Sequence, residues 1–279
     1  MTKSVLEVFR EEGLKGKSES TCDTYIHALE QFNHWLEGTG TNLEDFSRSD
    51  VQQYIDYLTA KRKSAATVNK IWNAIKPFAR WTGNAKAVQD IRVVKMADLK
   101  KQAPKGLDRI ERNRLVREVD RDGNKRDYAI ILMLLYTGVR VRELVSLNRD
   151  DIQKSERKGE VRVIGKGNRE RIIPLNVEVR RALTDYLDQR GDNQPALFLS
   201  SRVKRISIRS VQTVLGKYKV HPHALRHTFI TGLVRAGEDI SVIQSLSGHQ
   251  SADMVLRYSQ PTAQDKEKAV ENIYINSSG

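Results

Sequence analysis

Apolar residues recur every three or four positions along the first eighty residues, and this spacing constrains the fold more than any other feature of the sequence. Residues three and four apart lie on the same face of an α-helix, so each set forms one apolar stripe that needs burial. The stripes are Tyr25, Leu29, Phe32 and Leu36; Val51, Tyr54, Ile55 and Leu58; and Val68, Ile71, Ile75 and Phe78. Residues 1–85 therefore predict a compact bundle of about four helices.

The chain beyond residue 106 predicts a second and larger unit. Helices are expected over 109–119 and 125–137, and the second of these is apolar nearly all round, as a buried helix is. Residues 160–164 then alternate between apolar and polar, a glycine-rich turn follows, and residues 169–175 return. This pattern predicts a small antiparallel hairpin.

From Val177 onward the pattern is helical again, with loops expected at 191–196 and 220–224. Residues 86–106 hold six basic and two acidic side chains, show weak periodicity and include Pro104, so they predict a basic linker between two domains. The expected fold is mainly α. A helical domain (1–85) precedes a mixed, mostly α domain (107–279) that contains a small antiparallel β-sheet.

The positive charge of the chain is concentrated in its second part. Residues 1–85 hold 11 basic and 11 acidic side chains, so the remaining residues carry the whole formal net charge of +13. The run 200–219 contains six basic side chains and no acidic one. A field of this kind attracts polyanions, and nucleic acid is the leading candidate because its phosphates release counterions on binding.

Several protein classes are excluded by simple features of the sequence. The apolar run Ala129–Tyr136 is far shorter than the ~18 residues that a membrane helix needs. The first thirteen residues contain no apolar signal-peptide core, so we expect no export. The single cysteine, Cys22, rules out an internal disulfide and a cysteine-rich zinc site, which fits the reducing cytoplasm.

Four short segments of the second unit concentrate groups suited to phosphate chemistry. They are TGVRVREL (137–144), IGKGNRER (164–171), HALRH (223–227) and SGHQSADMVLRY (247–258). Each is weak alone: an arginine three residues before a glutamate is often a surface ion pair, and a lysine in a hairpin tip is often a solvated turn residue. The histidines near residue 221 lack a carboxylate or cysteine at ligand spacing, which argues against a metal site.

Taken together, the four segments resemble the tyrosine recombinase (integrase) family. In that family an arginine in a TGxRxxEL-like helix is followed by a hairpin lysine, an HxLRH motif, a Gly-His pair and a tyrosine nine residues after that histidine. The matching residues here are Arg140, Lys166, His223, Arg226, His249 and Tyr258. The resemblance extends over the whole chain, because family members also begin with a small helical core-binding domain. Ser247 departs from the common pattern, in which leucine precedes the Gly-His pair.

The chemistry of these side chains suits metal-free phosphodiester transfer. Arg140 and Arg226 offer permanently charged forks for the non-bridging phosphate oxygens. Tyr258 is the expected nucleophile and His223 the candidate base that lowers the cost of deprotonating it. His249 is expected to donate a hydrogen bond to the phosphate. By resemblance, Lys166 is the general acid for the leaving 5′ oxygen. Glu143 is expected to orient its neighbours or to form a helix-face ion pair.

The resemblance also implies the partners of the reaction. Double-stranded DNA with inverted-repeat half-sites is the expected substrate, bound by a homodimer at each core site and by a homotetramer when two sites pair. The reaction needs no cofactor and no metal. Six basic side chains of the run 200–219 are the candidate DNA contacts: Arg202, Lys204, Arg205, Arg209, Lys217 and Lys219. A predicted helix over 262–275 is expected to dock on a neighbouring subunit.

Two functions of other classes share parts of this pattern. A type IB topoisomerase uses nearly the same chemistry but rejoins the same strand, and the amino-terminal bundle and the tail helix favour a recombinase over it. A non-catalytic DNA-binding regulator would not need the complete set of six residues. Within the recombinases the chain resembles TnpI-type cointegrate resolvases of class II transposons most, and a Xer-like recombinase or a phage or mobile-element integrase is the alternative.

Overall fold

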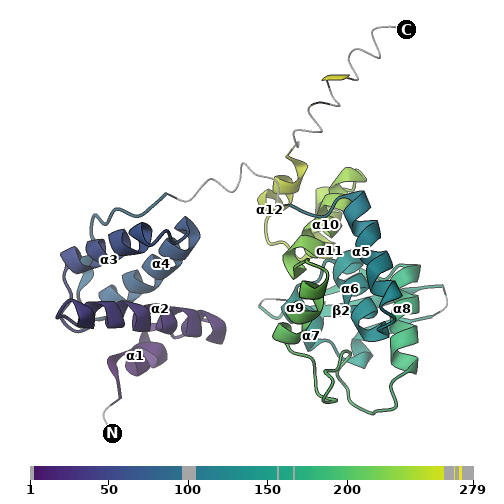
Figure 1. The fold of residues 1–279 in the computed structure, drawn as a ribbon, viewed down its shortest axis with the longest axis horizontal. Coiled ribbons are helices and arrows are strands. Elements are labelled where there is room, and N and C mark those ends of the chain that lie inside the picture. Colours follow the sequence, from purple (N-terminus) through teal and green to yellow (C-terminus); the bar gives the residue numbers. More distant parts are fainter. Residues whose placement is uncertain are drawn as a thin grey trace. The chain divides into compact units, whose positions relative to one another are not determined.

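The computed structural model describes residues 3–95, 105–155, 157–165 and 167–260, together with residues 267, 270 and 271. The chain forms two compact units, one up to residue 99 and one from residue 100 (Figure 1). The mainly helical fold class predicted from the sequence is confirmed, including the small antiparallel sheet. Within the described ranges, no helix is long and apolar enough to cross a membrane.

The first unit is a helical bundle. Its elements are α1 (Val5–Val8), the π-helical turn η1 (Phe9–Gly13), α2 (Glu19–Gly38), α3 (Arg48–Ala60), α4 (Ala65–Trp81) and the 3-10 turn η2 (Ala85–Val88). The three predicted stripes fall on α2, α3 and α4, and nearly all of their residues are buried in one core. Ser64 caps α4, since its hydroxyl accepts a hydrogen bond from the backbone N–H of Thr67.

The chain from η2 onward packs on this bundle as far as residue 94, although the sequence places residues 86–94 in the linker. Ala87 is buried against the bundle, and Val88, Ile91 and Val93 pack against the same core. The side chain of Gln52 in α3 accepts a hydrogen bond from the backbone N–H of Arg92 at 2.8 Å and donates one to its carbonyl at 3.2 Å. Val88, Ile91 and Val93 thus hold this segment against the bundle, although their irregular spacing gives no helical period.

The second unit combines helices and short helical turns with a three-stranded sheet. Its elements are α5 (Arg109–Arg121), α6 (Lys125–Thr137), α7 (Val141–Ser146), η4 (Arg149–Asp151), β1 (Ile152–Lys154), β2 (Gly159–Ile164), β3 (Glu170–Pro174), α8 (Val177–Asp188), α9 (Ile208–Lys217), α10 (Pro222–Arg235), α11 (Ile240–Ser247), α12 (Ala252–Leu256) and η5 (Arg257–Ser259). Helix α6 is the centre of the core, since residues 129–134 have no exposed surface. Helices α5, α8 and α10 pack around it.

The sheet is antiparallel, in the order β1-β2-β3. Val161 pairs with Ile173 in β3 and with Ile152 in β1, and Val163 and Ile173 turn into the core. The predicted hairpin is β2-β3, whereas β1 has three residues and too little alternation for the sequence to indicate a strand.

The loop expected at 220–224 is wrong in its second half, because α10 begins at Pro222. Proline is favoured in the first turn of a helix, where its missing N–H costs nothing. The His221 ring completes the helix start by accepting a hydrogen bond from the backbone N–H of Ala224 at 3.1 Å. Pro222 therefore begins a helix inside the range where the sequence predicts a loop.

Candidate active site

The turn between α6 and α7 places Arg140 at the start of a helix. Gly138 ends α6 in the left-handed conformation, at φ +61°, and a Cβ at this position would lie 2.3 Å from the Phe229 ring. Glycine is therefore required both by the backbone and by the packing. The half-buried side chain of Arg140 then extends from the N-cap of α7 toward the Gly248 carbonyl, with Nη2 at 3.5 Å from that oxygen.

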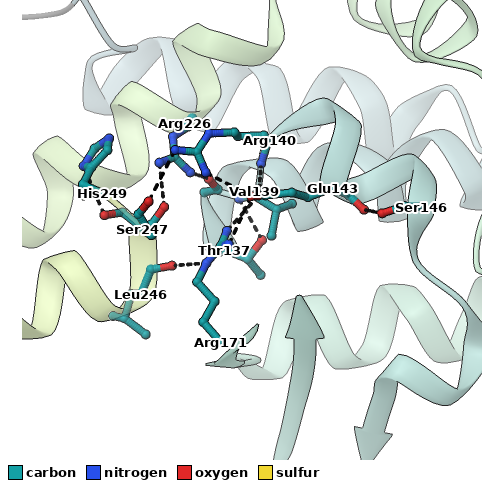
Figure 2. Close-up of polar contacts among 12 residues, drawn as sticks. Thr137, Val139, Arg140, Glu143, Ser146, Arg171, Arg226, Leu246, Ser247 and His249 are labelled. Atoms are coloured by element: carbon teal, nitrogen blue, oxygen red, sulfur yellow. Dashed lines mark hydrogen bonds and ion pairs between the residues drawn. The ribbon is translucent and has the colours of Figure 1, made fainter. Parts of the chain in front are cut away.

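Glu143 lies one helical turn beyond Arg140 and is only 6% exposed. Its carboxylate accepts hydrogen bonds from the Arg140 backbone N–H at 2.7 Å and from Arg140 Nη1 at 3.0 Å. Arg171 in β3 donates two more, at 3.1 and 2.8 Å (Figure 2). Burial alone would raise the pKa of Glu143, but the hydrogen bonds from Arg171 and Arg140 outweigh burial and lower it.

Arg171 is a site residue that the sequence reasoning missed. Besides its two bonds to Glu143, it donates from Nε to the Leu246 carbonyl at 3.0 Å, so it connects β3 to the end of α11 (Figure 2). Gly248 has φ +66°, and a Cβ there would lie 3.1 Å from the Arg171 guanidinium. The sequence did contain a signal for Arg171. In the hairpin strand, residues 169–171 read RER, and because side chains alternate along a strand, Arg171 points to the face opposite Glu170.

Arg226 is buried in α10 and is held by two backbone carbonyls. Nη1 donates to Gly138 at 2.5 Å and Nη2 donates to Ser247 at 2.6 Å, so the side chain joins the α6–α7 turn to the end of α11 (Figure 2). Burial and then the nearby Arg140 lower the pKa of Arg226 to about 10, which leaves the guanidinium charged at neutral pH. A fixed positive charge in a poorly solvated position acts strongly on a phosphate placed beside it.

His249 follows directly on the segment that binds Arg226. Its Nδ1 lies 3.2 Å from the Ser247 hydroxyl, and its ring stacks near the Tyr258 ring with centroids 6.1 Å apart. Burial, followed by the charges of Arg226 and Arg140, lowers the pKa of His249 to about 4, so the ring is neutral at pH 7. The Ser247 side chain thus contacts a candidate site residue, although leucine is common at this position in the family.

Tyr258 lies in η5 with 8% of its surface exposed. Its Oη is 2.7 Å from Nδ1 of His227, a residue of the HALRH segment that the sequence reasoning did not assign to the site. Burial raises the pKa of Tyr258, while the charges of Arg226, Arg257 and Arg140 act in the opposite direction. The phenol therefore lies close enough to both candidate phosphate-binding arginines for their charges to act on it.

His223, the candidate base, lies one turn before His227 and is exposed. Its ring stacks toward that of His227 with centroids 6.3 Å apart. Among the described residues it makes no polar contact with Tyr258. The phenol therefore contacts the second histidine of the HALRH segment rather than the first.

The structure brings five of the six predicted catalytic residues into one constellation, formed by α7, α10 and the segment 247–258. Lys166 lies outside the described residues. Gly165, directly before it, lies beside the site, since a Cβ there would be 3.5 Å from the Glu143 carboxylate. The predicted tail helix, 262–275, also lies almost entirely outside the described residues. The described part of the chain contains no cluster of histidine, cysteine and carboxylate side chains that could hold a metal ion.

The six predicted DNA contacts divide into two groups. Arg205 is bound to α7 and the turn after it, donating to the carbonyls of Val145 and Leu147 at 2.9 Å and to the Asn148 side chain. Lys217 lies 3.5 Å from the buried Asp127 carboxylate. The other four side chains are exposed and form no hydrogen bond or ion pair within the described structure: Arg202, Lys204, Arg209 and Lys219.

Comparison with known proteins agrees with the two-unit arrangement. The phage integrase family matches residues 105–265, and the N-terminal SAM-like domain of phage integrases matches residues 5–87. Tyrosine recombinase XerA of Pyrococcus furiosus is 34% identical, over 92% of this chain and 89% of its own length. Tyrosine recombinase XerC of Staphylococcus epidermidis is 31% identical, over 93% of this chain and 91% of its own.

Among solved structures, the XerH site-specific recombinase bound to its difH substrate has the same fold. Its TM-score is 0.71 at 18% identity, and the match covers 97% of this chain and 85% of that one. Family, sequence relatives and fold agree with the resemblance carried by the four motifs. The chain belongs to the phage integrase family and is a tyrosine recombinase.

Proposed function

We propose that this protein carries out site-specific DNA recombination with Tyr258 as the nucleophile. The observation that carries the proposal is the position of the phenol. Its Oη is held at 2.7 Å by an uncharged imidazole, and its ring lies beside His249. The positive charges of Arg226 and Arg140 act on the same phenol. A phosphate between these groups would meet a nucleophile and two fixed charges at once.

The step exchanges one phosphodiester for another. Tyr258 Oη forms a bond to the scissile phosphorus, the bond from phosphorus to the 5′ oxygen breaks, and that oxygen takes a proton from Lys166. The product is a 3′-phosphotyrosyl link and a free 5′-hydroxyl. Attack by the 5′-hydroxyl of another strand reverses the step and joins new partners. The energy of the phosphodiester is preserved throughout, so neither ATP nor a metal ion is required.

The remaining residues divide the work of binding the phosphate. Arg140, which is half-buried, reaches the non-bridging oxygens, and Arg226 supplies a second charge from its fixed position. If the Ser247 hydroxyl donates to Nδ1 of His249, the ring carries its proton on Nε2 and can donate it to the phosphate. His223, exposed in the first turn of α10, makes no polar contact with the phenol in the described structure and is open to a bound DNA strand.

Among recombinase roles we propose a Xer-like one. The relatives at 34% and 31% identity are Xer recombinases, and XerH is crystallised with a DNA substrate. The substrate is then double-stranded DNA with inverted half-sites, occupied by two protomers at each core site and four in the paired complex, at the nucleoid. Resolution of transposon cointegrates, the role suggested by the TnpI-type resemblance, is the second candidate and differs in the sites used rather than in the chemistry.

Trapping the covalent adduct tests the chemistry and finds the site together. The protein is incubated with genomic DNA from the organism that encodes it, in EDTA, and DNA linked to protein through its 3′ end is sequenced. The expected result is one enriched palindromic site, an adduct with the wild type and none with Tyr258→Phe, while DNA binding by the variant stays within a few-fold. An adduct with Tyr258→Phe, or a strict need for a divalent ion, overturns the assignment.

The recovered site then separates the competing functions. Two copies on one plasmid should be recombined, with the intervening DNA excised or inverted. A type IB topoisomerase would relax the supercoiled plasmid without exchanging the sites. Recovery at a chromosomal site supports the Xer-like role, and recovery within a class II transposon supports cointegrate resolution.

A further inference from the structure

His227 and Tyr258 form a polar pair that neither the motifs nor the predicted roles anticipate. His227 belongs to α10 and Tyr258 to η5. The two residues are 31 positions apart in the sequence, and the centroids of their rings are 5.6 Å apart. The distance of 2.7 Å between Nδ1 and Oη is that of a good hydrogen bond. Because Tyr258 is buried, this bond fixes the position of the phenol oxygen far more tightly than solvent would.

The direction of this hydrogen bond follows from acidity. A phenol is a much stronger acid than a neutral imidazole N–H, so the Tyr258 hydroxyl donates and the unprotonated Nδ1 accepts. The His227 ring then carries its single proton on Nε2. This tautomer leaves Nδ1 with its lone pair directed at the atom that would attack the phosphate.

The surroundings of His227 keep the ring neutral. The groups that face it are His221, His223 and Arg226 on α10, Arg257 and Tyr258 on η5, and His249 after α11. None of these is a carboxylate. Burial, followed by His223 and Arg226, lowers the pKa of His227 to about 4. At neutral pH the ring can therefore receive a proton, and an incoming phosphate would add negative charge that raises its affinity for one.

We propose that His227 holds the Tyr258 hydroxyl and accepts its proton as the phenol attacks the phosphate. As the bond from Oη to phosphorus forms, the Oη–H proton moves to Nδ1 and the bond to the 5′ oxygen breaks, with that oxygen protonated by Lys166. An aryl oxygen that is bonding to phosphorus holds its proton very weakly, so a weak base suffices when the events are concerted. This inference rests on the proposed function of Tyr258.

A competing arrangement would use the same contact to store Tyr258 away from the DNA until the protein is activated. The two predict opposite effects of breaking the bond. If His227 assists the attack, losing Nδ1 slows cleavage. If His227 restrains the phenol, losing Nδ1 speeds cleavage.

The test uses substitutions that differ in where they place a polar atom. In His227→Asn the amide reaches about the position of Nδ1, in His227→Gln it reaches about that of Nε2, and His227→Phe keeps a ring without nitrogen. Each full-length variant is mixed with a duplex containing the site recovered by adduct sequencing, nicked so that cleavage is irreversible. Covalent adduct is measured in single-turnover reactions from pH 5 to 9, alongside half-site binding and thermal unfolding.

We expect His227→Phe and His227→Gln to form adduct about 100-fold more slowly than the wild type, with binding unchanged within a few-fold. His227→Asn should fall between these variants and the wild type, slower than the wild type by more than about tenfold, because its amide oxygen can hold the phenol but cannot take its proton. Wild-type cleavage should fall as the pH drops through the pKa of His227 in the complex, and this acidic limb should be absent from His227→Asn.

Cleavage by His227→Gln that equals or exceeds that of His227→Asn overturns the inference, and so does faster cleavage by His227→Phe. If His227→Phe unfolds at a lower temperature than the wild type, the comparison of His227→Asn with His227→Gln still tests the inference, because the two variants carry the same amide group at different positions. Failure of the proposed function is distinguishable, since the wild type and Tyr258→Phe would then give the same result.

Discussion

Arg171 in β3 holds Glu143 in α7 through two hydrogen bonds, Nη1 to Oε1 at 3.1 Å and Nη2 to Oε2 at 2.8 Å. The same guanidinium reaches the Leu246 carbonyl, so one side chain joins the sheet, the Arg140 helix and the segment that carries His249. The relative positions of the candidate phosphate-binding groups therefore depend on a residue that need not touch the phosphate itself.

Replacing Arg171 by methionine should destabilise the protein and slow cleavage together. The substitution leaves the buried Glu143 with Arg140 as its remaining cation, and breaking a buried ion pair costs about 3 kcal/mol. Urea unfolding measures the loss of stability, and adduct formation measures the effect on the site. Arg169→Met in the same hairpin is the matched control, since the structure shows no ion pair for the Arg169 side chain among the described residues and its removal should cost little. Equal stability of the two variants would contradict the role of Arg171.

The lowered pKa of Glu143 predicts how stability depends on pH. The folded-state pKa lies below the ordinary value of 4.5, so the ionised carboxylate contributes stability that is fully present above that value. This contribution is lost as the pH falls through the folded-state pKa, because the native state must then take up a proton against two guanidinium groups. In Glu143→Gln this dependence should disappear. Unfolding free energies measured between pH 7 and pH 3 check it, and equal slopes for the two proteins would contradict it.

Gly138→Ala should be among the most disruptive single-methyl additions in the catalytic unit. The new Cβ would lie 2.3 Å from the Phe229 ring, and the left-handed backbone adds its own cost. Gly123 also has a positive φ, +70°, but a Cβ there would meet nothing within 4 Å. Gly123→Ala should therefore lose about 1 kcal/mol from the backbone alone, and Gly138→Ala at least twice as much. Thermal and urea unfolding of the two variants measure the difference. Equal losses of unfolding free energy would show that the contact with Phe229 does not contribute.

Arg205 and Arg202, three positions apart in one basic run, should behave differently. Arg205→Ala should lower stability, because it leaves the carbonyls of Val145 and Leu147 without this donor. Arg202→Ala should leave stability unchanged and weaken DNA binding, with the slope of log K against log salt reduced by about one. Unfolding experiments and DNA binding at several salt concentrations, carried out on both variants, test whether Arg205 is structural and Arg202 contacts DNA. A salt effect of Arg205→Ala that equals that of Arg202→Ala would place both side chains on the DNA.

The sequence indicated the elements whose signals are local. The stripes of α2, α3 and α4, the uniformly apolar α6 and the β2-β3 hairpin all follow from the spacing of apolar residues, and the structure confirms them. Strand β1 and the packed segment 87–94 were missed because a few apolar residues at irregular spacing carry no period. The start of α10 at Pro222 was missed, because proline breaks a helix interior but suits the first turn of a helix.

The candidate site shows the same division between local and distant information. The motifs by themselves determined which residues have the right chemistry, because an arginine, a histidine or a tyrosine keeps its charge, acidity and reach in any fold. Only the tertiary structure decided which of them meet. The Tyr258 phenol contacts His227 rather than His223, Arg226 is held by carbonyls of Gly138 and Ser247, and Arg171 holds Glu143. Each contact joins residues 21 to 88 positions apart. These contacts depend on how α10 packs against α6, α11 and η5 and how α11 packs against β3, which no local pattern records.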